Sequence, residues 1–245
     1  MKPLILIPAR LAATRLPNKP LADIEGKPMI VRAWEAASKS GFRVAVAAGD
    51  QEIVDVVQAA GGEAVLTDPN LPSGSDRIRV AADLLDPTGA HDIVINVQGD
   101  MPFASPNLSK ICADLLETRR QADIVTLVAA ETDASERANP DVVKAVVAVD
   151  EDGRSGRALY FTRSVLYGDA PIWHHIGIYG YRREALVRFC AAPPSPLEKR
   201  EKLEQLRALE MGMTIWTGII DEAPVSVDNA EDLEAARAVA RSLNG

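Results

Sequence analysis

Short apolar runs alternate with amphipathic stretches along the first half of the chain. Apolar and polar residues do not alternate within these runs. Such unbroken apolar runs are typical of strands that are buried on both faces of a sheet. The predicted strands are Leu4–Ile7, Val44–Ala48, Ala64–Leu66, Ile93–Val97 and Ile124–Ala129. Helical spacing predicts helices between them, at about Met29–Ser40, Glu52–Ala60, Asp76–Leu85 and Asn107–Arg120. This order predicts an α/β fold with a mixed, mostly parallel sheet flanked by helices, whose ligand binds at the carboxyl ends of the strands.

The second half has a different pattern, with strands and few intervening helices. The expected strands are Val142–Val149, Leu159–Thr162 and Gly177–Tyr181. Ser195, followed by a proline and three residues later by Glu198, predicts a capping box that starts a helix. The apolar face of this helix is expected at Leu203, Leu206 and Leu209, and a last helix is expected from about Glu231. Without internal repeats or a clear linker, the chain is expected to form one compact unit.

Composition and charge limit the function. The chain has 245 residues, of which 47% are hydrophobic and 25% charged, as in a globular protein rather than a disordered or membrane-spanning one. The net charge of -8 argues against binding to nucleic acid or anionic membranes through the overall field. The apolar run at the N-terminus is too short for a signal peptide, and the only cysteines, Cys112 and Cys190, lack metal-ligand spacing. We therefore expect reduced thiols and a cytoplasmic location.

The loop Pro8–Leu21, directly after the first strand, is a candidate phosphate site. It contains three cations, Arg10, Arg15 and Lys19, among small residues whose backbone N–H groups could also bind an anion. It has the glycines of neither a Walker loop nor a dinucleotide-binding fingerprint. The alternative is a polar surface loop with solvated charges.

Asp100 follows the predicted strand Ile93–Val97 and a glycine. A carboxylate at the end of such a strand suits Mg²⁺ that is shared with substrate phosphates, whereas Gly-Asp before a proline is also ordinary turn chemistry. Near the last helix, Asp228 or Asn229 is a natural N-cap.

Two further segments could bind a substrate. The turn Ser73–Arg77 enters a helix whose N-terminus, with Arg77, could bind an anion or a base edge, but a plain cap by Ser73 or Ser75 explains it equally well. The segments Tyr160–Arg163 and His174–Arg182 concentrate aromatic and histidine residues. Adjacent histidines on a strand face opposite ways, so this region fits a surface for a carboxylate and hydroxyls, with Arg163 as the bidentate partner, better than a metal site. The alternative is an aromatic strand that faces the core.

Taken together, these segments resemble the 3-deoxy-manno-octulosonate cytidylyltransferases nearly from end to end. The segments that carry the family's motifs are Pro8–Leu21, Ser73–Arg77, Val97–Pro102, Asn139–Lys144, Ala158–Arg163, His175–Arg182, Pro194–Glu198 with Leu203–Arg207, and Val227–Leu233. The chain departs from the motifs at Ala13, Asn18, Met101 and Lys199. Asn18 replaces a glycine, and asparagine is the residue that best tolerates a left-handed backbone there.

The resemblance implies a Rossmann-like nucleotide-diphospho-sugar transferase fold in a single domain, 1–245. Residues to about 130 would form a nucleotide-binding half, and the remainder a half that binds the sugar and contacts the second subunit of a homodimer. The implied enzyme transfers CMP from CTP to the anomeric hydroxyl of 3-deoxy-D-manno-octulosonate (Kdo), with Mg²⁺, for lipopolysaccharide biosynthesis. The alternatives are a cytidylyltransferase for 8-amino-Kdo or a sialic acid, and a non-catalytic nucleotide-binding protein.

The resemblance also implies roles for individual residues. The catalytic residues would be Arg10, Lys19 and Asp100, and the metal ligands Asp100 and Asp228. The nucleotide would contact Pro8, Ala9, Arg10, Arg15, Lys19, Ser75, Arg77 and Gln98. The sugar acid would contact Arg163, His175, Tyr179, Glu204 and Gln205.

Overall fold

The computed structural model describes residues 1–12, 16–131, 133–168 and 170–244. Its contacts divide the chain into two compact units, which are described separately here. Unit 1 comprises Met1–Lys110 and Pro224–Gly245, and unit 2 comprises Ile111–Ala223. The C-terminal segment therefore belongs with the first unit, whereas the sequence analysis divided the chain near residue 130. The single-domain organisation of the chain stays a prediction.

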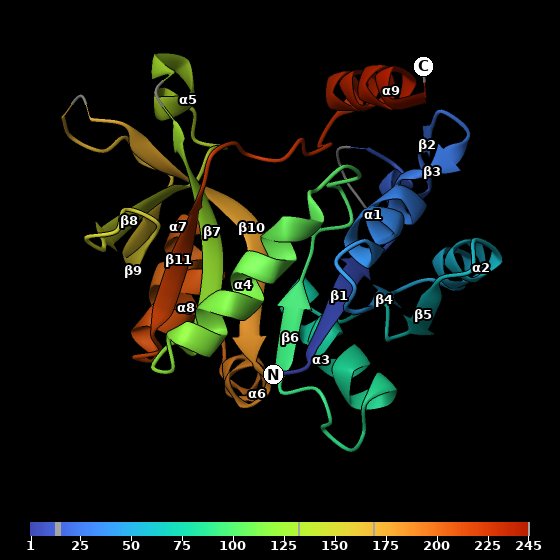
Figure 1. Ribbon diagram of the computed structural model, residues 1–245, viewed down its shortest axis with the longest axis horizontal. Coiled ribbons are helices and arrows are strands. Elements are labelled where there is room, and N and C mark those ends of the chain that lie inside the picture. Colours follow the sequence, from blue (N-terminus) through green and yellow to red (C-terminus); the bar gives the residue numbers. More distant parts are fainter. Residues whose placement is uncertain (13–15, 132, 169, 245) are drawn as a thin grey trace. The chain divides into compact units, whose positions relative to one another are not determined.

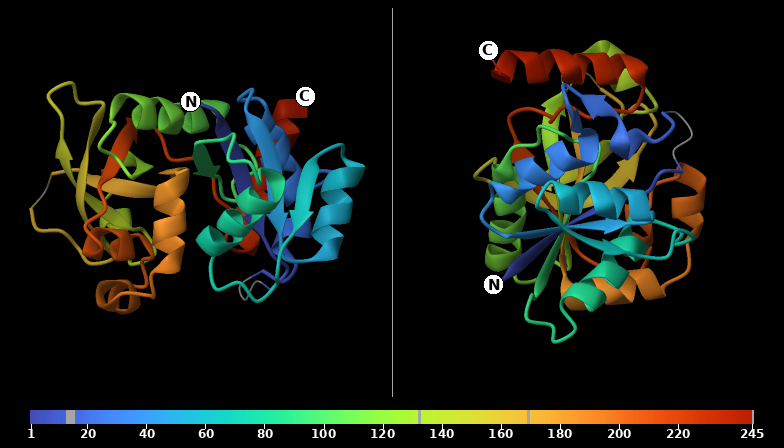
Figure 2. Two further views of the ribbon diagram at one scale, coloured as in Figure 1. Left: turned by 90° about the horizontal axis from the view of Figure 1, so that it is seen from below. Right: turned by 90° about the vertical axis from the view of Figure 1, so that its right-hand side faces the viewer.

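Unit 1 contains a parallel sheet with the strand order β5-β4-β1-β6. Helices α1 and α2 cover one face of this sheet and α3 covers the other (Figure 2). The elements are β1 (Pro3–Ala9), η1 (Lys19–Leu21), β2 (Asp23–Ile24), β3 (Lys27–Pro28), α1 (Met29–Ser38), β4 (Arg43–Ala48), α2 (Gln51–Ala59), β5 (Glu63–Leu66), α3 (Gly74–Leu85), β6 (Ile93–Asn96), the start of α4 (Pro106–Thr118) and α9 (Ala230–Asn244). Four of the expected strands, at β1, β4, β5 and β6, and the helices expected between them are confirmed within a few residues.

The order of strands in unit 1 creates a place for a ligand. Strand β1 lies between β4 and β6, and the chain visits β4 and β5 on one side before it crosses to β6 on the other. The chain therefore leaves the carboxyl ends of β1 and β6 in opposite directions. In open α/β sheets, ligands bind in the crevice that this divergence leaves. Arg10 follows the last residue of β1, and Gln98 follows β6 by two residues.

An apolar cluster packs the C-terminal segment against the rest of unit 1. Figure 1 shows α9, in red, beside the short hairpin of β2 and β3. The buried residues of this cluster are Ile24, Met29, Val227, Leu233, Ala236 and Ala240. The backbone N–H of Val227 also donates to the carbonyl of Asp100, over 3.0 Å. This packing holds Asp228, the next residue, close to the loop that follows β6.

Unit 2 contains a mixed sheet with the strand order β10-β7-β11-β9-β8, in which β7 and β11 are parallel and the other pairs antiparallel. Its elements are the rest of α4, β7 (Ile124–Glu131), α5 (Ala134–Ala138), β8 (Lys144–Val149), β9 (Ser155–Thr162), β10 (Ile172–Arg182), α6 (Arg183–Ala191), α7 (Pro196–Glu201), α8 (Gln205–Glu210) and β11 (Ile215–Ile220). A mixed sheet was expected for the chain, and unit 2 contains one.

Several features of unit 2 differ from the sequence prediction. The strand β11 and the helices α5 and α6 were not predicted, and β10 begins at Ile172 rather than at Gly177. The helix expected after Ser195 is two short helices, because Lys202 adopts a left-handed backbone with φ 55° and ends α7. The capping box itself is confirmed: Ser195 Oγ accepts from the backbone N–H of Glu198, and the Glu198 carboxylate accepts from that of Ser195. No helix in the described part of the chain is long and apolar enough to cross a membrane.

Candidate functional site

Two cavities open at the carboxyl ends of β1 and β6, both within unit 1. They have volumes of about 160 and 140 Å³ and share four lining residues, so they adjoin each other, and the two together are called the pocket. The shared lining is Pro8, Ala9, Arg10 and Gln98. The first cavity adds Leu71, Ser73, Gly74 and Arg77, and the second adds Lys19, Pro20, Gly99 and Asp100. The pocket thus collects most of the residues that the sequence assigned to the nucleotide and lies where the sheet topology places a ligand.

Backbone contacts fix the chain where it leaves β1. The N–H of Gly49 donates to the carbonyl of Ala9 over 2.8 Å, and the N–H of Leu11 donates to the Asp50 carboxylate over 2.8 Å. Further along the loop, Asn18 adopts the expected left-handed backbone, with φ 54°, and leads into η1. The predicted nucleotide contact Arg15 lies outside the described residues.

Gly99 allows the loop after β6 to pass close to β1. A Cβ atom on Gly99 would lie 3.1 Å from Ile30 Cδ1 and 3.4 Å from the carbonyl oxygen of Pro8. Any larger side chain would press against the end of β1, because the oxygen belongs to the backbone. The glycine therefore allows the chain that carries Gln98 and Asp100 to lie close to the end of β1.

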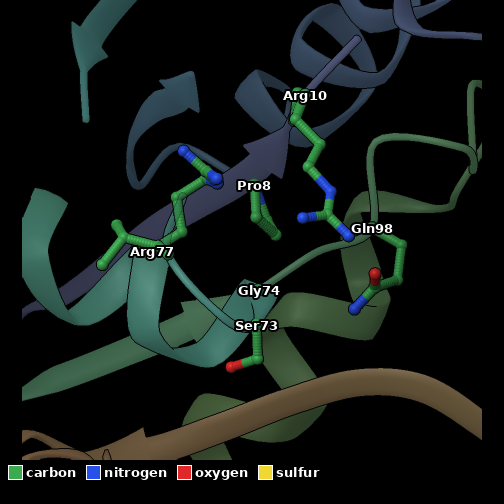
Figure 3. A pocket seen from close by; sticks show the side chains of 8 residues that line it. Pro8, Arg10, Ser73, Gly74, Arg77 and Gln98 are labelled. Atoms are coloured by element: carbon green, nitrogen blue, oxygen red, sulfur yellow. The ribbon is translucent and has the colours of Figure 1, made fainter. Parts of the chain in front are cut away.

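The two arginines of the pocket have different surroundings. Arg10 is exposed and extends from the end of β1 toward Gln98 (Figure 3). Arg77 is only 2% exposed. Its guanidinium donates to Thr67 Oγ1 over 2.5 Å and to the backbone carbonyls of Asp68 and Pro69 over 3.1 and 3.3 Å. Burial lowers the pKa of Arg77, and the nearby charge of Arg10 lowers it further. Arg77 therefore shapes the pocket wall by holding residues 67–69, and Arg10 is the arginine that projects toward solvent.

The entry to α3 shows which serine faces the pocket. Ser73 is the N-cap, and its Oγ accepts from the backbone N–H of Asp76 over 3.1 Å. Ser73 also lines the first cavity (Figure 3). Ser75, which the sequence analysis chose for the nucleotide, is buried and is not among the lining residues of that cavity. The sequence offered both serines as caps, and in the structure Ser73 is the N-cap.

Lys19 joins two carboxylates that are remote in sequence. Its Nζ lies 2.8 Å from Asp100 Oδ2 and 2.9 Å from Asp228 Oδ1. Burial alone would lower the pKa of Lys19, but the two carboxylates outweigh it and raise the pKa, so the side chain stays an ammonium. The predicted meeting of Asp100 and Asp228 therefore occurs within unit 1, around a positive charge.

The same two carboxylates have the chemistry that Mg²⁺ requires. Their oxygens converge on one cation, and Mg²⁺ is commonly held by one or two carboxylates together with substrate phosphates. Among the described residues, no cluster of three or more His, Cys, Asp or Glu side chains could hold a metal. The donor set thus fits an ion whose remaining ligands come from the substrate and water.

In unit 2, the structure brings His175 and Tyr179 together. Their ring centroids are 5.4 Å apart, although four residues of a regular strand span about 13 Å. The register of β10 against β7 shifts between Ile176 and Tyr179, and this bulge shortens the distance. Thr126 lies beneath the bulge, with Oγ1 2.9 Å from His175 Nε2 and 2.8 Å from the carbonyl oxygen of Ile178.

Both rings are uncharged. Burial, and then the neighbouring His174, lower the pKa of His175 to about 3. Burial raises the pKa of Tyr179 well above its usual value, and Tyr181 and Glu204 raise it further. Glu204 is therefore electrostatically close to this pair. A neutral imidazole and a phenol provide hydrogen-bonding groups for hydroxyls, without a charge of their own.

Arg163 has backbone partners. It donates to the carbonyl of Glu201 over 3.2 Å and to that of Pro140 over 2.8 Å, and neither hydrogen bonds nor ring contacts of the described residues join it to His175 or Tyr179. The buried ammonium of Lys144 donates in turn to the carbonyl of Arg163, over 3.2 Å. The sequence predicted that Arg163 binds a carboxylate with two hydrogen bonds. In the structure its guanidinium is instead hydrogen-bonded to the backbone of the surrounding loops.

Gln205, the remaining predicted sugar contact, begins α8 and is buried. The sequence analysis did not single out Arg207, which lies on the same helix and is 5% exposed. Arg207 donates to both carboxylate oxygens of Glu198, over 2.8 and 2.6 Å, and its guanidinium lies 4.6 Å from the centre of the Phe189 ring. Glu198, the acidic residue of the capping box, could have indicated a basic partner such as Arg207. The two residues meet because the chain turns at Lys202, between α7 and α8.

Comparison with known proteins adds independent information. Residues 4–215 match the family model described as cytidylyltransferase. The chain is 58% identical to a 3-deoxy-manno-octulosonate cytidylyltransferase of Parvibaculum lavamentivorans, over 96% of this chain and 92% of that protein. It is 55% identical to one of Methylobacterium radiotolerans, over 99% of each.

Solved structures agree with these relatives. A CMP:2-keto-3-deoxy-manno-octonic acid synthetase complexed with CTP superposes with a TM-score of 0.90 at 36% identity, over 99% of this chain and 100% of that one. A 4-diphosphocytidyl-2C-methyl-D-erythritol synthase of Anaerococcus prevotii has a TM-score of 0.64 at 12% identity, over 98% of each chain, and shares the fold alone.

Proposed function

Because the chain belongs to the 3-deoxy-manno-octulosonate cytidylyltransferase family, we propose that it transfers CMP from CTP to the anomeric hydroxyl of Kdo. The reaction yields CMP-Kdo and pyrophosphate, and its product would serve lipopolysaccharide biosynthesis. The observation that carries the proposal is the pocket at the ends of β1 and β6, where Arg10, Lys19 and Asp100 line one cavity. A basic residue that projects into a pocket next to paired carboxylates suits a nucleoside triphosphate and a divalent ion.

In this reaction the anomeric oxygen attacks the α-phosphorus of CTP. The bond from that phosphorus to its bridging oxygen breaks, and the oxygen leaves with the electron pair as part of pyrophosphate. Arg10, Lys19 and Arg15 would bind the triphosphate and offset the charge that develops on the leaving group. Gln98, Arg77, Ser73 and the backbone at Pro8 and Ala9 would position the cytidine, because all five line the first cavity, whereas Ser75 does not. The proton of the attacking hydroxyl is released to water.

Asp100 and Asp228 would hold Mg²⁺ through their carboxylate oxygens. A bound Mg²⁺ supplies neutralisation of phosphate charge and acidifies a coordinated hydroxyl.

The sugar acid would be bound by residues of unit 2. Arg163 would face its carboxylate, because a guanidinium matches a carboxylate with two parallel hydrogen bonds. His175, Tyr179, Glu204 and Gln205 would bind its hydroxyls. The neutral state of His175 and Tyr179 supports this assignment, because each ring then offers a polar atom without a charge that needs a counter-ion.

We also propose a cytoplasmic homodimer. Burial raises the pKa of the Cys112 thiol to about 12, which keeps it protonated and unreactive and fits a reducing compartment. Unit 2 exposes large apolar side chains at Val149, Leu159 and Tyr167, which supports a subunit contact in that unit. Light scattering coupled to size-exclusion chromatography tests the dimer directly.

The activity is tested by pyrophosphate release with Mg²⁺ and CTP, comparing Kdo, 8-amino-Kdo and N-acetylneuraminate. We expect release with Kdo. Release with only one of the other acids would keep the nucleotide pocket but overturn the assignment of the sugar. Release with none, from protein that binds CTP, would favour a non-catalytic nucleotide-binding protein.

A further inference from the structure

Lys19 occupies a position that a metal ion also requires. Its ammonium donates to Oδ2 of Asp100 over 2.8 Å and to Oδ1 of Asp228 over 2.9 Å, so it bridges these two oxygens. A cation that binds both of these oxygens has to lie in the same place. Two positive ions at this distance repel, and the amino group has no lone pair to offer while it stays protonated. A lysine side chain is ordinarily protonated at neutral pH.

Lys19 also has a second set of acceptors within reach. It lines the cavity that contains Arg10 and Gln98, next to the carboxylates. Its flexible four-carbon side chain can turn the ammonium from the carboxylates to an anion in that cavity. A triphosphate bound there offers several oxygens, whereas the carboxylates then gain a divalent ion. After this exchange the ammonium faces the triphosphate and the divalent ion faces the carboxylates, so neither anionic group is left without a cation.

The charges explain why such an exchange is needed. Asp100 and Asp228 together carry two negative charges, and their side chains are only 26% and 49% exposed. Without a cation between them they would repel each other and also repel an incoming triphosphate. Lys19 removes part of this repulsion, and it therefore keeps the site receptive to the nucleotide.

We propose that Lys19 competes with the metal for Asp100 and Asp228, and that the triphosphate relieves this competition by drawing the ammonium away. This inference rests on the proposed function, because it assumes that the pocket binds a triphosphate with a divalent ion. It makes metal binding dependent on the nucleotide: the protein alone holds the ion weakly, and CTP strengthens its binding through Lys19. Lys19 is thus a competitor of the metal while the nucleotide is absent and a phosphate contact once it is bound.

The alternative arrangement predicts the opposite sign. The other oxygen of each carboxylate could bind the metal while Lys19 stays in place and holds the pair together. Removing Lys19 would then weaken metal binding, because the carboxylates would lose their orientation. Under competition, removing the ammonium strengthens metal binding.

The experiment is Mn²⁺ binding to Lys19→Met and to wild-type protein without nucleotide, followed by the electron paramagnetic resonance signal of the free ion. Methionine is unbranched and of similar length but carries no charge. We expect Lys19→Met to bind Mn²⁺ about 10-fold more tightly than wild type, within the usual range of coupling between sites. Unchanged or weaker binding overturns the inference. Lys27→Met is the matched control, because Lys27 pairs with Glu35, away from the pocket lining, and should leave the affinity unchanged.

A second measurement tests the movement of Lys19. With EDTA present, calorimetry should show that Lys19→Met binds CTP about 10-fold more weakly, whereas binding of CMP, which lacks the outer phosphates, changes much less. An equal loss for CTP and CMP would contradict a role at the outer phosphates. If Lys19→Met does not fold, Lys19→Gln replaces it with the same expected directions.

These readouts need neither turnover nor a sugar acid. A protein that releases no pyrophosphate but shows tighter Mn²⁺ binding in Lys19→Met keeps the inference and rejects the proposed reaction. An active protein with unchanged Mn²⁺ binding rejects the inference alone.

Discussion

Asn229 caps helix α9, and its neighbour Asp228 pairs with Lys19 instead of capping the helix. The Asn229 Oδ1 accepts from the backbone N–H groups of Glu231 and Asp232, over 2.8 and 3.0 Å. The Asp232 carboxylate accepts in return from the N–H groups of Asp228 and Asn229. The helix terminus is therefore satisfied by Asn229 and Asp232, and the Asp228 carboxylate can face the pocket.

Asp228→Asn and Asn229→Ala should therefore have different effects. Asp228→Asn should lower Mg²⁺-dependent turnover by about 100-fold or more, since a lost metal ligand removes several kcal/mol of charge stabilisation. Asn229→Ala should lower the free energy of unfolding by about 1 kcal/mol, as expected for a lost N-cap. Steady-state kinetics and urea unfolding of both variants check this contrast. A large loss of activity in Asn229→Ala alone would reverse the two roles.

Asp100→Asn should abolish turnover with Mg²⁺ and leave the fold intact. Asparagine has nearly the same shape, but its amide is a poorer ligand for a hard divalent ion than a carboxylate. The measurement is pyrophosphate release, and circular dichroism with thermal unfolding serves as the control for folding. Full activity in this variant would remove Asp100 from the metal site.

Arg10→Ala and Arg77→Ala separate binding from stability. Arg10 is exposed, so its removal should weaken CTP binding by about 10-fold or more, with unfolding free energy within about 0.5 kcal/mol of wild type. Arg77 is buried and holds residues 67–69, so its removal should also destabilise the protein, by about 2–3 kcal/mol, because the buried hydroxyl of Thr67 and two backbone carbonyls lose their donor. Calorimetry with CTP and urea unfolding measure the two effects. Equal stability losses in both variants would contradict the distinction.

His175 should make the protein less stable in mild acid. The folded state holds the pKa of His175 near 3, whereas the unfolded chain binds a proton near the usual pKa of 6.5. Lowering the pH below 6.5 therefore favours the unfolded state, by about 2 kcal/mol between pH 7 and pH 5 for this single group. His175→Gln should reduce the acid sensitivity by that amount in urea titrations at the two pH values. Identical pH dependence in wild type and variant would show that His175 is protonated in the folded protein.

Arg207→Leu should destabilise the protein by about 3 kcal/mol, because Glu198 would keep a mostly buried charge without its partner. Glu198→Gln, which keeps a hydrogen-bond acceptor for Arg207, should cost less. Burial opposes ionisation of Glu198, but its hydrogen bonds with Arg207 outweigh that effect and lower its pKa. The stabilisation should therefore be present above the usual glutamate pKa and disappear as the pH falls through the lower folded value. Unfolding at neutral and acid pH tests both statements.

The sequence by itself determined the local structure that depends on neighbouring residues. Unbroken apolar runs predicted the parallel strands of unit 1, since strands buried on both faces have no polar side. The capping box at Ser195 and the left-handed backbone at Asn18 were also correct, because both depend on the chemistry of one or a few residues. The order of the motifs was sufficient to indicate the family.

Tertiary structure decided what depends on residues far apart in the chain. The meeting of Lys19 with Asp100 and Asp228 spans 81 and 209 positions, and only the crossing of the chain at β6 and the packing of α9 on the β2–β3 hairpin produce it. The bulge that joins His175 to Tyr179 arises from the register of β10 against β7, which no local pattern encodes. The left-handed turn at Lys202 interrupts a helical pattern whose spacing alone predicted continuity. Local propensities therefore set the elements, and the burial of their apolar faces against one another set the chemistry of the pocket.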